Sequence, residues 1–460
     1  MNSKDLVKLG VPLGEPMRHA VTLISKLVLG GKKEELEMQF KAVLADPSSY
    51  TKDPLRGEFA RALLKAPPPP RDKPVPYKQW GKDLEHEAVM QMERACLLPI
   101  SVQGALMPDA HVGYGLPIGG VLAVEGAVIP YAVGVDIACR MKMTVLDWPA
   151  RELDRKPEAL IQAIETETRF GVGARFDKLK RQHAVMDEDW SVSPITKANR
   201  DKAWTQLGTS GSGNHFVEFG LFTAREKIGS LEPGEYFALL THSGSRGTGA
   251  AVCQHYSKAA IDAHTDLHSE LKRLAWLPLD SQAGQEYWNA MELMGRYAAA
   301  NHAVIHEHIA KRLGAQVLLD IENHHNFAWK ENHGGKEVVV HRKGATPAGQ
   351  GVLGIIPGSM ASPGFVVRGK GNPDSLNSAS HGAGRVMSRK AAVESLSWEK
   401  ANRLLKENRV KLISAGLDEV PMVYKDIHTV MAAQADLVDV LGRFDPRIVK
   451  MAPSGERAED

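Results

Sequence analysis

The stretch Tyr131-Ala-Val-Gly-Val-Asp-Ile-Ala-Cys-Arg140 places a carboxylate, Asp136, three residues before a thiol, Cys139, behind an apolar, strand-like approach. A thiolate can bridge two metal ions, and a neighbouring carboxylate can complete the ligand shell of one of them. Taken alone, the pattern D-x-x-C also fits a buried cysteine that packs as a small hydrophobic residue. The glycine-rich flanks and the histidine motifs downstream favour a metal site.

The composition is that of a soluble globular protein. At 460 residues the chain is long enough for one large domain or two, and 43% of its residues are hydrophobic and 24% charged. No apolar run is long enough to span a bilayer, and the first residues lack the apolar core of a secretory signal. We therefore expect no membrane partner. Three cysteines cannot all pair in disulfides, which favours a reducing, cytoplasmic environment. With a net charge of +2, any nucleic acid must be held by a local basic patch.

Residues 1–76 predict a helical N-terminal extension that ends in a proline-rich linker. The apolar residues of one of its helices repeat at helical spacing: Leu36, Phe40, Val43 and Leu44. The run Ala66-Pro-Pro-Pro-Pro70 favours an extended spacer, with a ligand for an SH3-type domain as the alternative.

Residues 77–460 predict a single large α+β catalytic domain, with mixed and antiparallel sheets flanked by helices. The periodicity favours helices over residues 85–98 and 286–313, and we expect the functional residues on loops that follow strands. Three histidines of the second helix are assigned to packing or to the surface: His302, His306 and His308.

A glycine-rich loop at residues 107–121 lets backbone amides approach a ligand closely, but it lacks the Lys-Ser or Lys-Thr of a phosphate loop. Asp109 and His111 in this loop fit either a functional site or a role in bracing the turn.

The candidate metal ligands are one carboxylate, one thiolate and three imidazoles: Asp136, Cys139, His215, His242 and His325. Bridged by sulfur, this set is sufficient for two divalent ions with open positions for substrate. Its spacing is not that of a zinc ribbon or of an H-E-x-x-H helix. Adjacent residues of a strand face opposite ways, so only one of His324 and His325 can point into a given site.

The candidate phosphate contacts are Arg246, Lys343, Arg385 and Arg389. We expect the last two on one face of a helix after His381, near a helix N-terminus that is itself an anion site. Two metals among phosphate-binding groups indicate phosphoryl or nucleotidyl transfer. His381, flanked by small residues, is then a candidate nucleophile, with a general acid or a simple phosphate contact as alternatives.

From about residue 77 to residue 450, the chain resembles the RtcB-type RNA ligases. The resemblance rests on nine motifs in the order of that family: Pro108-Asp-Ala-His111, Val133-Gly-Val-Asp-Ile-Ala-Cys139, Gly211-Ser-Gly-Asn-His215, His242-Ser-Gly-Ser-Arg246, His325-Asn326, Arg342-Lys-Gly-Ala-Thr-Pro347, Pro357-Gly-Ser-Met360, His381-Gly-Ala-Gly-Arg385 and Tyr424-Lys-Asp426.

The resemblance implies two Mn(II) ions bridged by Cys139, with Asp136 and His215 on one ion and His242 and His325 on the other. It implies that GTP guanylylates His381, and that the guanylyl group passes to an RNA 3′-phosphate before a 5′-hydroxyl end displaces GMP. A 2′,3′-cyclic phosphate would first be hydrolysed. The implied role is transfer RNA splicing or RNA repair, and the implied partners are RNA ends, GTP and an activating protein. The implied GTP-binding residues are Asn214, Glu218, Asn326, Ser359, Gly382, Gly384, Tyr424 and Lys450.

The chain departs from the family pattern near the cysteine and near Ser359. Ala138 and Arg140 stand where the family usually has glycines, and Arg140 would either contact an RNA phosphate or crowd the metal loop. Gly364 stands where the family often has a second serine. These departures keep open a metal-dependent RNA-end phosphoesterase that does not seal strands. A non-catalytic RNA-end binder is a third hypothesis, which the intact ligand and nucleophile set argues against.

Overall fold

The computed structural model describes residues 1–12, 14–65, 71–177, 180–265 and 267–456. The proline run at 66–70 lies outside the described residues, so the predicted spacer and the boundary at residue 76 stay predictions. Before it, the chain forms four short helices: α1 (Ser3–Lys8), α2 (Glu15–Leu29), α3 (Leu36–Ala45) and α4 (Gly57–Lys65).

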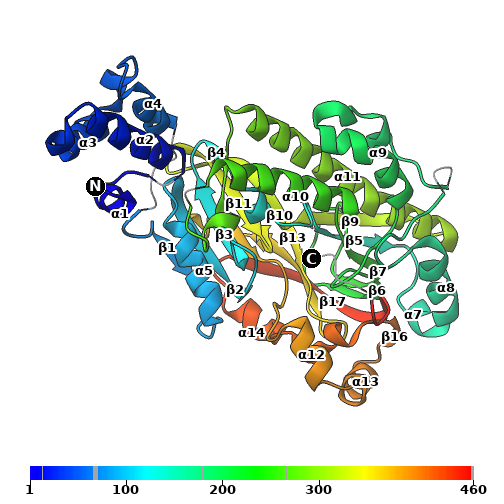
Figure 1. Ribbon diagram of the computed structural model, residues 1–460. Coiled ribbons are helices and arrows are strands. Elements are labelled where there is room, and N and C mark those ends of the chain that lie inside the picture. The colour runs from blue at the N-terminus through cyan, green and yellow to red at the C-terminus, as the bar shows by residue number, and fades with distance from the viewer. Residues whose placement is uncertain (13, 66–70, 178–179, 266, 457–460) are drawn as a thin grey trace.

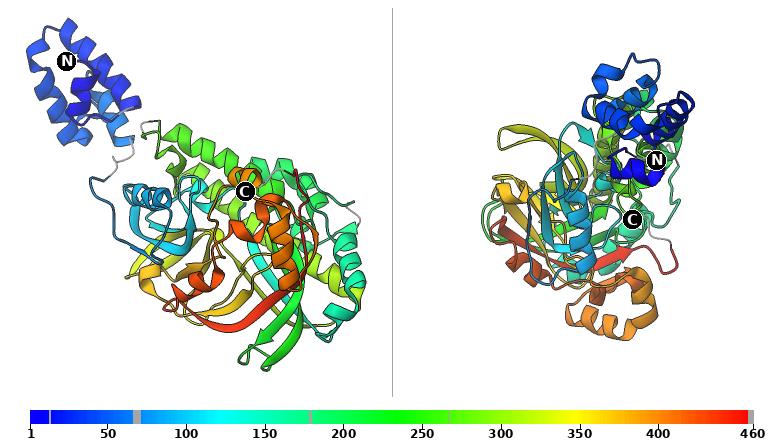
Figure 2. Two further views of the ribbon diagram at one scale, coloured as in Figure 1. Left: turned by 90° about the horizontal axis from the view of Figure 1, so that it is seen from below. Right: turned by 60° about the vertical axis from the view of Figure 1, so that its left-hand side comes forward.

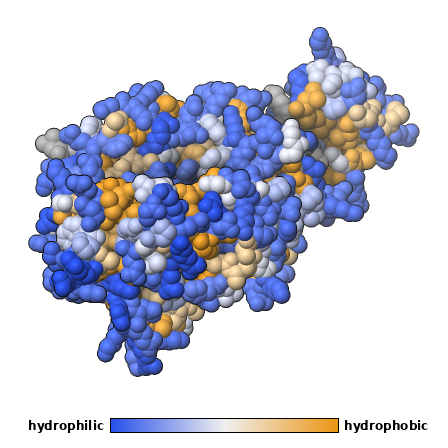
Figure 3. Space-filling model, turned by 180° about the vertical axis from the view of Figure 1, so that it is seen from behind, coloured by the Kyte–Doolittle hydropathy of each residue, from blue (hydrophilic) through white to orange (hydrophobic). Residues whose placement is uncertain are grey.

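The four N-terminal helices enclose a small core of their own. Leu23 and Leu27 of α2 pack with Phe40 of α3 and Phe59 of α4, and the rings of the two phenylalanines meet edge to face. The extension stands apart from the rest of the chain in Figures 1 and 2. Figure 3 shows apolar surface on it at the upper right, and exposed Leu29 and Met38 are among its apolar residues.

The body contains a smaller sheet of five strands in the described residues. Its order is β1 (Tyr77–Gln79), β2 (Ser101–His111), β3 (Ile118–Val124), β11 (Lys336–Lys343) and β10 (Asn326–His333). Only β1 and β2 run parallel.

A larger sheet continues the antiparallel pattern. Its order is β13 (Leu353–Ile356), β14 (Gly364–Gly369), β17 (Val438–Met451), β6 (Phe216–Ala224), β7 (Gly234–Ser243), β5 (Arg140–Leu146) and β9 (Val317–His324). β16 (Lys411–Ser414) pairs with β17 in parallel. Two small ladders join β12 (Ala345–Pro347) to β15 (Ser378–Ser380) and β4 (Ala127–Val128) to β8 (Leu277–Pro278).

The cores follow from the alternation of side chains along the strands. Ala105 of β2 and Val121 of β3 face a core that Phe365 and Val367 of β14 complete, so the two sheets pack together there. The residues that alternate with these along the strands, such as Leu122 of β3, face the helices on the other side of the smaller sheet.

Helices cover the outer faces of both sheets. The long α11 supplies Tyr287 to the core beside the smaller sheet, and Ile305 and Ile309 to the core behind the larger one. The helices of the body are α5 (His86–Cys96), α6 (Pro130–Val133), α7 (Glu152–Arg155), α8 (Pro157–Glu167), α9 (Pro194–Gln206), α10 (Arg246–Ala263), α11 (Gln282–Leu313), α12 (Arg389–Ser395), α13 (Trp398–Glu407) and α14 (Ile427–Ala432).

This architecture confirms the predicted α+β class, the mixed and antiparallel sheets, and the helical N-terminal extension. The helices expected at 85–98 and 286–313 are α5 and α11. The strand-like approach to Asp136 is wrong: residues 130–133 form α6, a short helix with Pro130 at its first turn, where proline is well tolerated. Among the helices described, none combines the length and the apolar character needed to cross a membrane.

Candidate active site

The ends of four neighbouring strands bring the predicted metal ligands together at one end of the larger sheet. These strands are neighbours in the order β6, β7, β5 and β9. His215 directly precedes β6, and Cys139 directly precedes β5. His242 lies near the end of β7, and His325 lies just after β9. Neighbouring strands run in opposite directions, so the start of one strand lies beside the end of the next at the same end of the sheet. The expectation that functional residues lie on loops after strands therefore holds for His325 alone of the five ligands, because His242 lies within β7 and the other three lie before strands.

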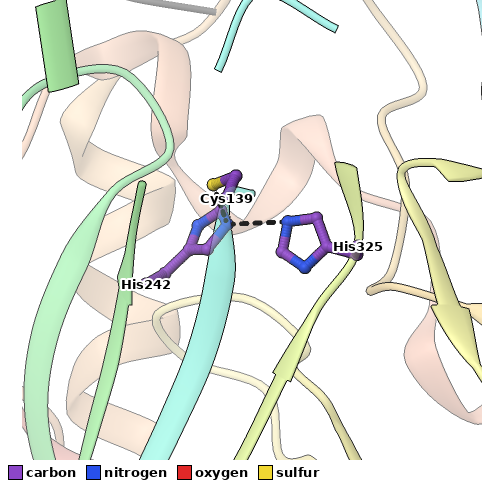
Figure 4. A group of neighbouring side chains, drawn as sticks. All are labelled: Cys139, His242 and His325. Carbon is purple, nitrogen blue, oxygen red and sulfur yellow. Dashed lines mark hydrogen bonds between the residues drawn. The ribbon is translucent and has the colours of Figure 1, made fainter. Parts of the chain in front are cut away.

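The ligand atoms form two groups that share the sulfur of Cys139. One group is Asp136, Cys139 and His215; the other is Cys139, His242 and His325; within each group all the ligand atoms lie within 4.8 Å of one another. Cys139 Sγ is 3.4 Å from Nε2 of His215 and 3.1 Å from Nε2 of His242. Figure 4 shows the second group, with the imidazoles of His242 and His325 turned toward each other beside the sulfur.

Backbone contacts orient the imidazoles. Nδ1 of His242 lies 3.0 Å from the carbonyl oxygen of Asn214, so it donates its proton there and leaves the Nε2 lone pair toward the cluster. Burial lowers the pKa of His242 to about 3, which keeps the ring neutral at pH 7. Nδ1 of His215 lies 2.9 Å from the carbonyl of Ser210.

These donors fit bound metal ions. Nε2 of His242 and Nε2 of His325 are 3.2 Å apart. Oδ2 of Asp136 is 3.0 Å from Nε2 of His215, and it has no satisfying hydrogen bond in the described chain. Lone pairs that converge in a buried site need a cation or a proton between them.

His381 lies beside this cluster, with its ring centroid 5.0 Å from that of His325. Its Nδ1 is 2.7 Å from Oδ2 of Asp109, and the same oxygen accepts hydrogen bonds from the backbone amides of His381 and Gly382. Asp109 is fully buried, and although burial raises the pKa of its carboxyl, the interaction with His381, which includes the hydrogen bond, and the charge of Lys425 together hold that pKa below its usual range. The carboxylate therefore keeps the Nδ1 proton of His381 and leaves Nε2 free as a nucleophile.

The loop predicted at residues 107–121 is confined to residues 112–117, because β2 extends to His111 and β3 begins at Ile118. Asp109, which touches the candidate nucleophile, therefore lies in β2. His111 instead braces the turn, with Nδ1 3.0 Å from the carbonyl of Asp109. Lys425, in the Tyr424-Lys-Asp426 motif, holds the same segment by donating to the carbonyls of Pro108 and Ala110.

Replacing Asp109 by asparagine is expected to slow covalent modification of His381 by about 10²- to 10⁴-fold. The amide keeps the shape of the side chain but no longer enforces the productive tautomer of the imidazole, a change that costs this order of rate in serine proteases. Single-turnover measurement of label on His381 tests this. A rate within threefold of wild type, with an unchanged melting temperature, would rule out the orienting role.

The expected helix after His381 is wrong. Residues 381–388 are irregular, Arg385 forms an isolated bridge with Tyr424, and α12 begins only at Arg389. Gly384 has a positive φ of 74°, and a Cβ there would lie 2.0 Å from the carbonyl of Asp109, so the chain turns tightly against β2 instead of winding into a helix.

The four predicted phosphate contacts all have partners within the protein. Arg385 and Arg389 both pair with Glu419, and Arg389 also lies 2.8 Å from Oδ2 of Asp418. Arg246 is buried and lies 3.2 Å from Nδ1 of His215. Buried Lys343 donates to the carbonyls of Tyr114 and Tyr131. Their contacts with RNA stay predictions.

A pocket opens next to the metal cluster. Four of the predicted GTP-binding residues line it: Asn214, Glu218, Ser359 and Tyr424. Burial raises the pKa of Glu218 well above its usual range, and no described basic side chain forms an ion pair with it. Gly364 also lines the pocket. The sequence analysis did not select Ser362, whose hydroxyl lies 2.9 Å from that of Ser359 and supplies a second serine.

Lys450 is not among the residues that line this pocket, and its contact with GTP stays a prediction. Its neighbours Val449 and Met451 line the pocket, and adjacent residues of a strand point to opposite faces. Lys450 lies on the other face of β17, 3.5 Å from a carboxylate oxygen of Glu165.

The other predicted GTP-binding residues are structural supports in this arrangement. Asn326 accepts from the amide of Gly344 and donates to the carbonyl of Asp136, which joins β10 to the metal loop. The amide of Gly382 binds Asp109. Their contact with GTP stays a prediction.

The two departures beside Cys139 have different consequences. Arg140 is buried and donates to Glu322 and to the carbonyl of Gly295, so it neither reaches an RNA phosphate nor crowds the metal loop, and both expectations for it are wrong. Ala138 has a φ of 58°, a left-handed conformation that suits glycine and costs a residue with a side chain about 1 kcal/mol. The bond from its amide to the carbonyl of Asn326, 2.7 Å long, holds that conformation.

Comparison with known proteins identifies the family. A model of the family described as "tRNA-splicing ligase RtcB" matches residues 91–195 and 184–451. The chain belongs to the RtcB family. Every candidate ligand, the candidate nucleophile and the pocket residues fall inside the matched segments, whereas the N-terminal helices do not.

Curated RtcB proteins from bacteria and archaea are similar over most of this ligase. "RNA-splicing ligase RtcB" of Escherichia coli K12 is 34% identical over a 397-residue alignment that covers 80% of this chain and 95% of that protein. "tRNA-splicing ligase RtcB" of Archaeoglobus fulgidus is 31% identical, covering 81% of this chain and 91% of the relative. The protein of the same name from Methanococcus maripaludis is 30% identical, covering 78% and 89%.

Proposed function

We propose that this protein is a GTP- and Mn(II)-dependent RNA ligase. It joins RNA 3′-phosphate or 2′,3′-cyclic phosphate ends to 5′-hydroxyl ends, in transfer RNA splicing or RNA repair. The observation that carries the proposal is the position of His381, whose imidazole is fixed by Asp109 beside two ligand groups that share the sulfur of Cys139.

His381 begins the proposed reaction as a nucleophile. With the Nδ1 proton held by Asp109, the Nε2 lone pair attacks the α-phosphorus of GTP, and the bond to the β-phosphate oxygen breaks to release pyrophosphate. The guanylyl group then passes from His381 to an RNA 3′-phosphate oxygen. Attack of the 5′-hydroxyl on that 3′-phosphorus forms the new phosphodiester and releases GMP.

Two Mn(II) ions would be held by the two groups that share Cys139: Asp136, Cys139 and His215, and Cys139, His242 and His325. When bound, such ions neutralise phosphate charge. Thiolate and imidazole bind zinc more tightly than manganese, so the use of manganese depends on its availability and on open coordination positions. To contact an RNA phosphate, the four basic groups would have to exchange their present partners within the protein: Arg246, Lys343, Arg385 and Arg389.

The pocket beside the cluster would hold guanine. Glu218 is a buried carboxyl without a basic partner, and the two N–H groups on one edge of guanine are donors that a carboxylate accepts. Ser359, Ser362 and Tyr424 supply further hydroxyls. Asn214, which lies between this pocket and the metal ligand His215, would meet the α-phosphate.

Replacing Glu218 by glutamine is expected to weaken guanosine binding by about 10- to 100-fold, because hydrogen bonds to a charged group contribute about 1.5–3 kcal/mol. The raised pKa of Glu218 means that guanosine binding to wild type releases a proton, so wild-type affinity should rise with pH below that pKa. Calorimetric titration at several pH values measures both effects. Equal affinities, with no pH dependence in wild type, would remove Glu218 from base recognition.

Labelling with GTP tests the proposed function. Wild-type protein is incubated with Mn(II) and α-labelled GTP, and an acid-labile, alkali-stable label on the protein is the expected result. RNA with a 3′-phosphate and RNA with a 5′-hydroxyl are then added, and the joined product is measured. If no label forms and cyclic-phosphate ends are opened, the protein is instead a metal-dependent RNA-end phosphoesterase.

A further inference from the structure

An exposed tyrosine stands on the loop after β2, the strand that carries the partner of His381. Tyr114 lies between β2 and β3 and is 55% exposed, although large aromatic side chains are usually buried. The guanidinium of Arg273 covers its ring, 4.5 Å from the centroid. Because the cation lies over one face of the ring, the exposed surface belongs to the other face and the ring edge.

The backbone around Tyr114 is fixed on both sides. Gln91 makes two hydrogen bonds with the preceding residue, Gly113, one to its carbonyl and one from its amide. The ammonium of Lys343 lies 2.5 Å from the carbonyl oxygen of Tyr114 itself. A Cβ on the following residue, Gly115, would lie 2.9 Å from the carbonyl of Arg273, so the two segments are in close contact. The backbone that carries the Tyr114 ring is therefore held in place.

The strands on both sides of this loop reach His381. Asp109, near the end of β2, forms the hydrogen bond to its Nδ1. Ile118, at the start of β3, packs beside Gly344, and a Cβ on Gly344 would lie 3.0 Å from Cε1 of His381. Tyr114 therefore lies on a loop whose two flanking strand ends are close to His381.

The surroundings of the ring carry positive charge. Lys272 and Arg273 are both exposed, and within the described chain neither of them has a carboxylate in salt-bridge range. Buried Lys343 is close enough to Arg273 for that charge to contribute to lowering its pKa to about 8, after the larger effect of burial. Proteins that bind single-stranded nucleic acid combine aromatic side chains, on which bases stack, with positive charge that attracts the backbone.

We propose that Tyr114 and Arg273 form a stacking platform for a nucleobase of the RNA end that enters the site. The inference rests on the proposed RNA ligase function and adds to it a residue that positions the RNA. The base stacks on the open face of Tyr114, and Arg273 supports the ring from behind and attracts the RNA backbone. Such stacking tolerates every base, since each has a π face, so it suits an enzyme that joins ends of differing sequence.

Fluorescence of 2-aminopurine tests the platform, because stacking quenches this base. Two short single-stranded RNAs are titrated with the full-length protein, one with 2-aminopurine beside a 3′-phosphate and one with it beside a 5′-hydroxyl. Wild type should quench at least one of them, and that probe identifies the end that is bound. Tyr114→Ala should lose the quench and bind that RNA about 10- to 100-fold more weakly, whereas Tyr114→Phe should stay within about twofold of wild type.

Tyr50→Ala is the matched control. Tyr50 also carries an arginine 4.5 Å from its ring centroid, but it lies in the N-terminal helical part, and its Arg56 is paired with Asp53. This variant should bind both RNAs as wild type does, and an equal loss in Tyr50→Ala would count against a specific platform. The platform is excluded if Tyr114→Ala keeps the quench and the affinity, if wild type quenches neither probe, or if Tyr114→Phe fails as Tyr114→Ala does.

The two proposals can fail separately. Absence of GTP-derived label on wild type would count against the ligase reaction. Equal RNA affinity of folded Tyr114→Ala and wild type, in a protein that does take the label, would count against the platform alone.

Discussion

Replacement of His381 by alanine is expected to abolish transfer of the guanylyl group to the protein and all joining of RNA ends. The variant retains the metal ligands and the nucleotide pocket, because His381 belongs to neither, so it should still bind guanosine. Loss of a covalent nucleophile costs on the order of 10⁶ in rate, which is below detection in a labelling assay. Electrophoresis after incubation with α-labelled GTP and Mn(II) measures the result.

The control for this experiment is another histidine of the same chain. His255 is exposed on α10 and touches the ring of Tyr256, outside the cluster and the pocket. His255→Ala should be labelled as wild type is. Persistent label on His381→Ala with the same acid lability would assign the nucleophile to another histidine, and the orienting contact with Asp109 would then need another explanation.

Replacement of Cys139 by alanine is expected to remove both metal ions, because both ligand groups contain its sulfur. The remaining pairs, Asp136 with His215 and His242 with His325, are too few to hold a divalent ion tightly. We expect the affinity for Mn(II) to fall more than 100-fold at both sites, and the label on His381 to disappear with it. Elemental analysis of the dialysed protein and titration followed by the paramagnetic signal of free Mn(II) measure the stoichiometry.

Cys253 provides a matched thiol for comparison. It is buried like Cys139, and burial raises its pKa to about 11, but its sulfur lies near the carbonyl of Pro130 and in neither ligand group. Cys253→Ala should therefore bind as much Mn(II) as wild type. If Cys139→Ala still binds two ions per chain, the sulfur does not bridge them.

Side-chain chemistry and short-range patterns predicted much of the candidate site. A thiol, a carboxylate and three histidines in motif-like contexts are unusual enough to be selected from the sequence, and the structure brings all five together. The alternation of residues along a strand correctly separated His325 from His324, whose ring instead packs against Phe327 and Trp329.

Errors arose where a contact distant in the sequence decides the local conformation. Helical spacing after His381 predicted that Arg385 and Arg389 lie on the same face of a helix. Because Gly384 packs against Asp109, the chain instead turns there, and α12 begins only at Arg389. The acidic partners of the two arginines also come from a distant segment.

The sequence by itself determined which chemical groups are present, the α+β class and the membership of the RtcB family, because composition, periodicity and motif order are local properties of the chain. Only the tertiary structure decided that Asp109 holds His381, that Ser362 joins the pocket, and that Tyr114 stands exposed between β2 and β3. Each of these facts is a contact or an exposure set by the register of antiparallel strands and by loops that meet across them. No spacing along the chain encodes which residues from two distant strands become neighbours.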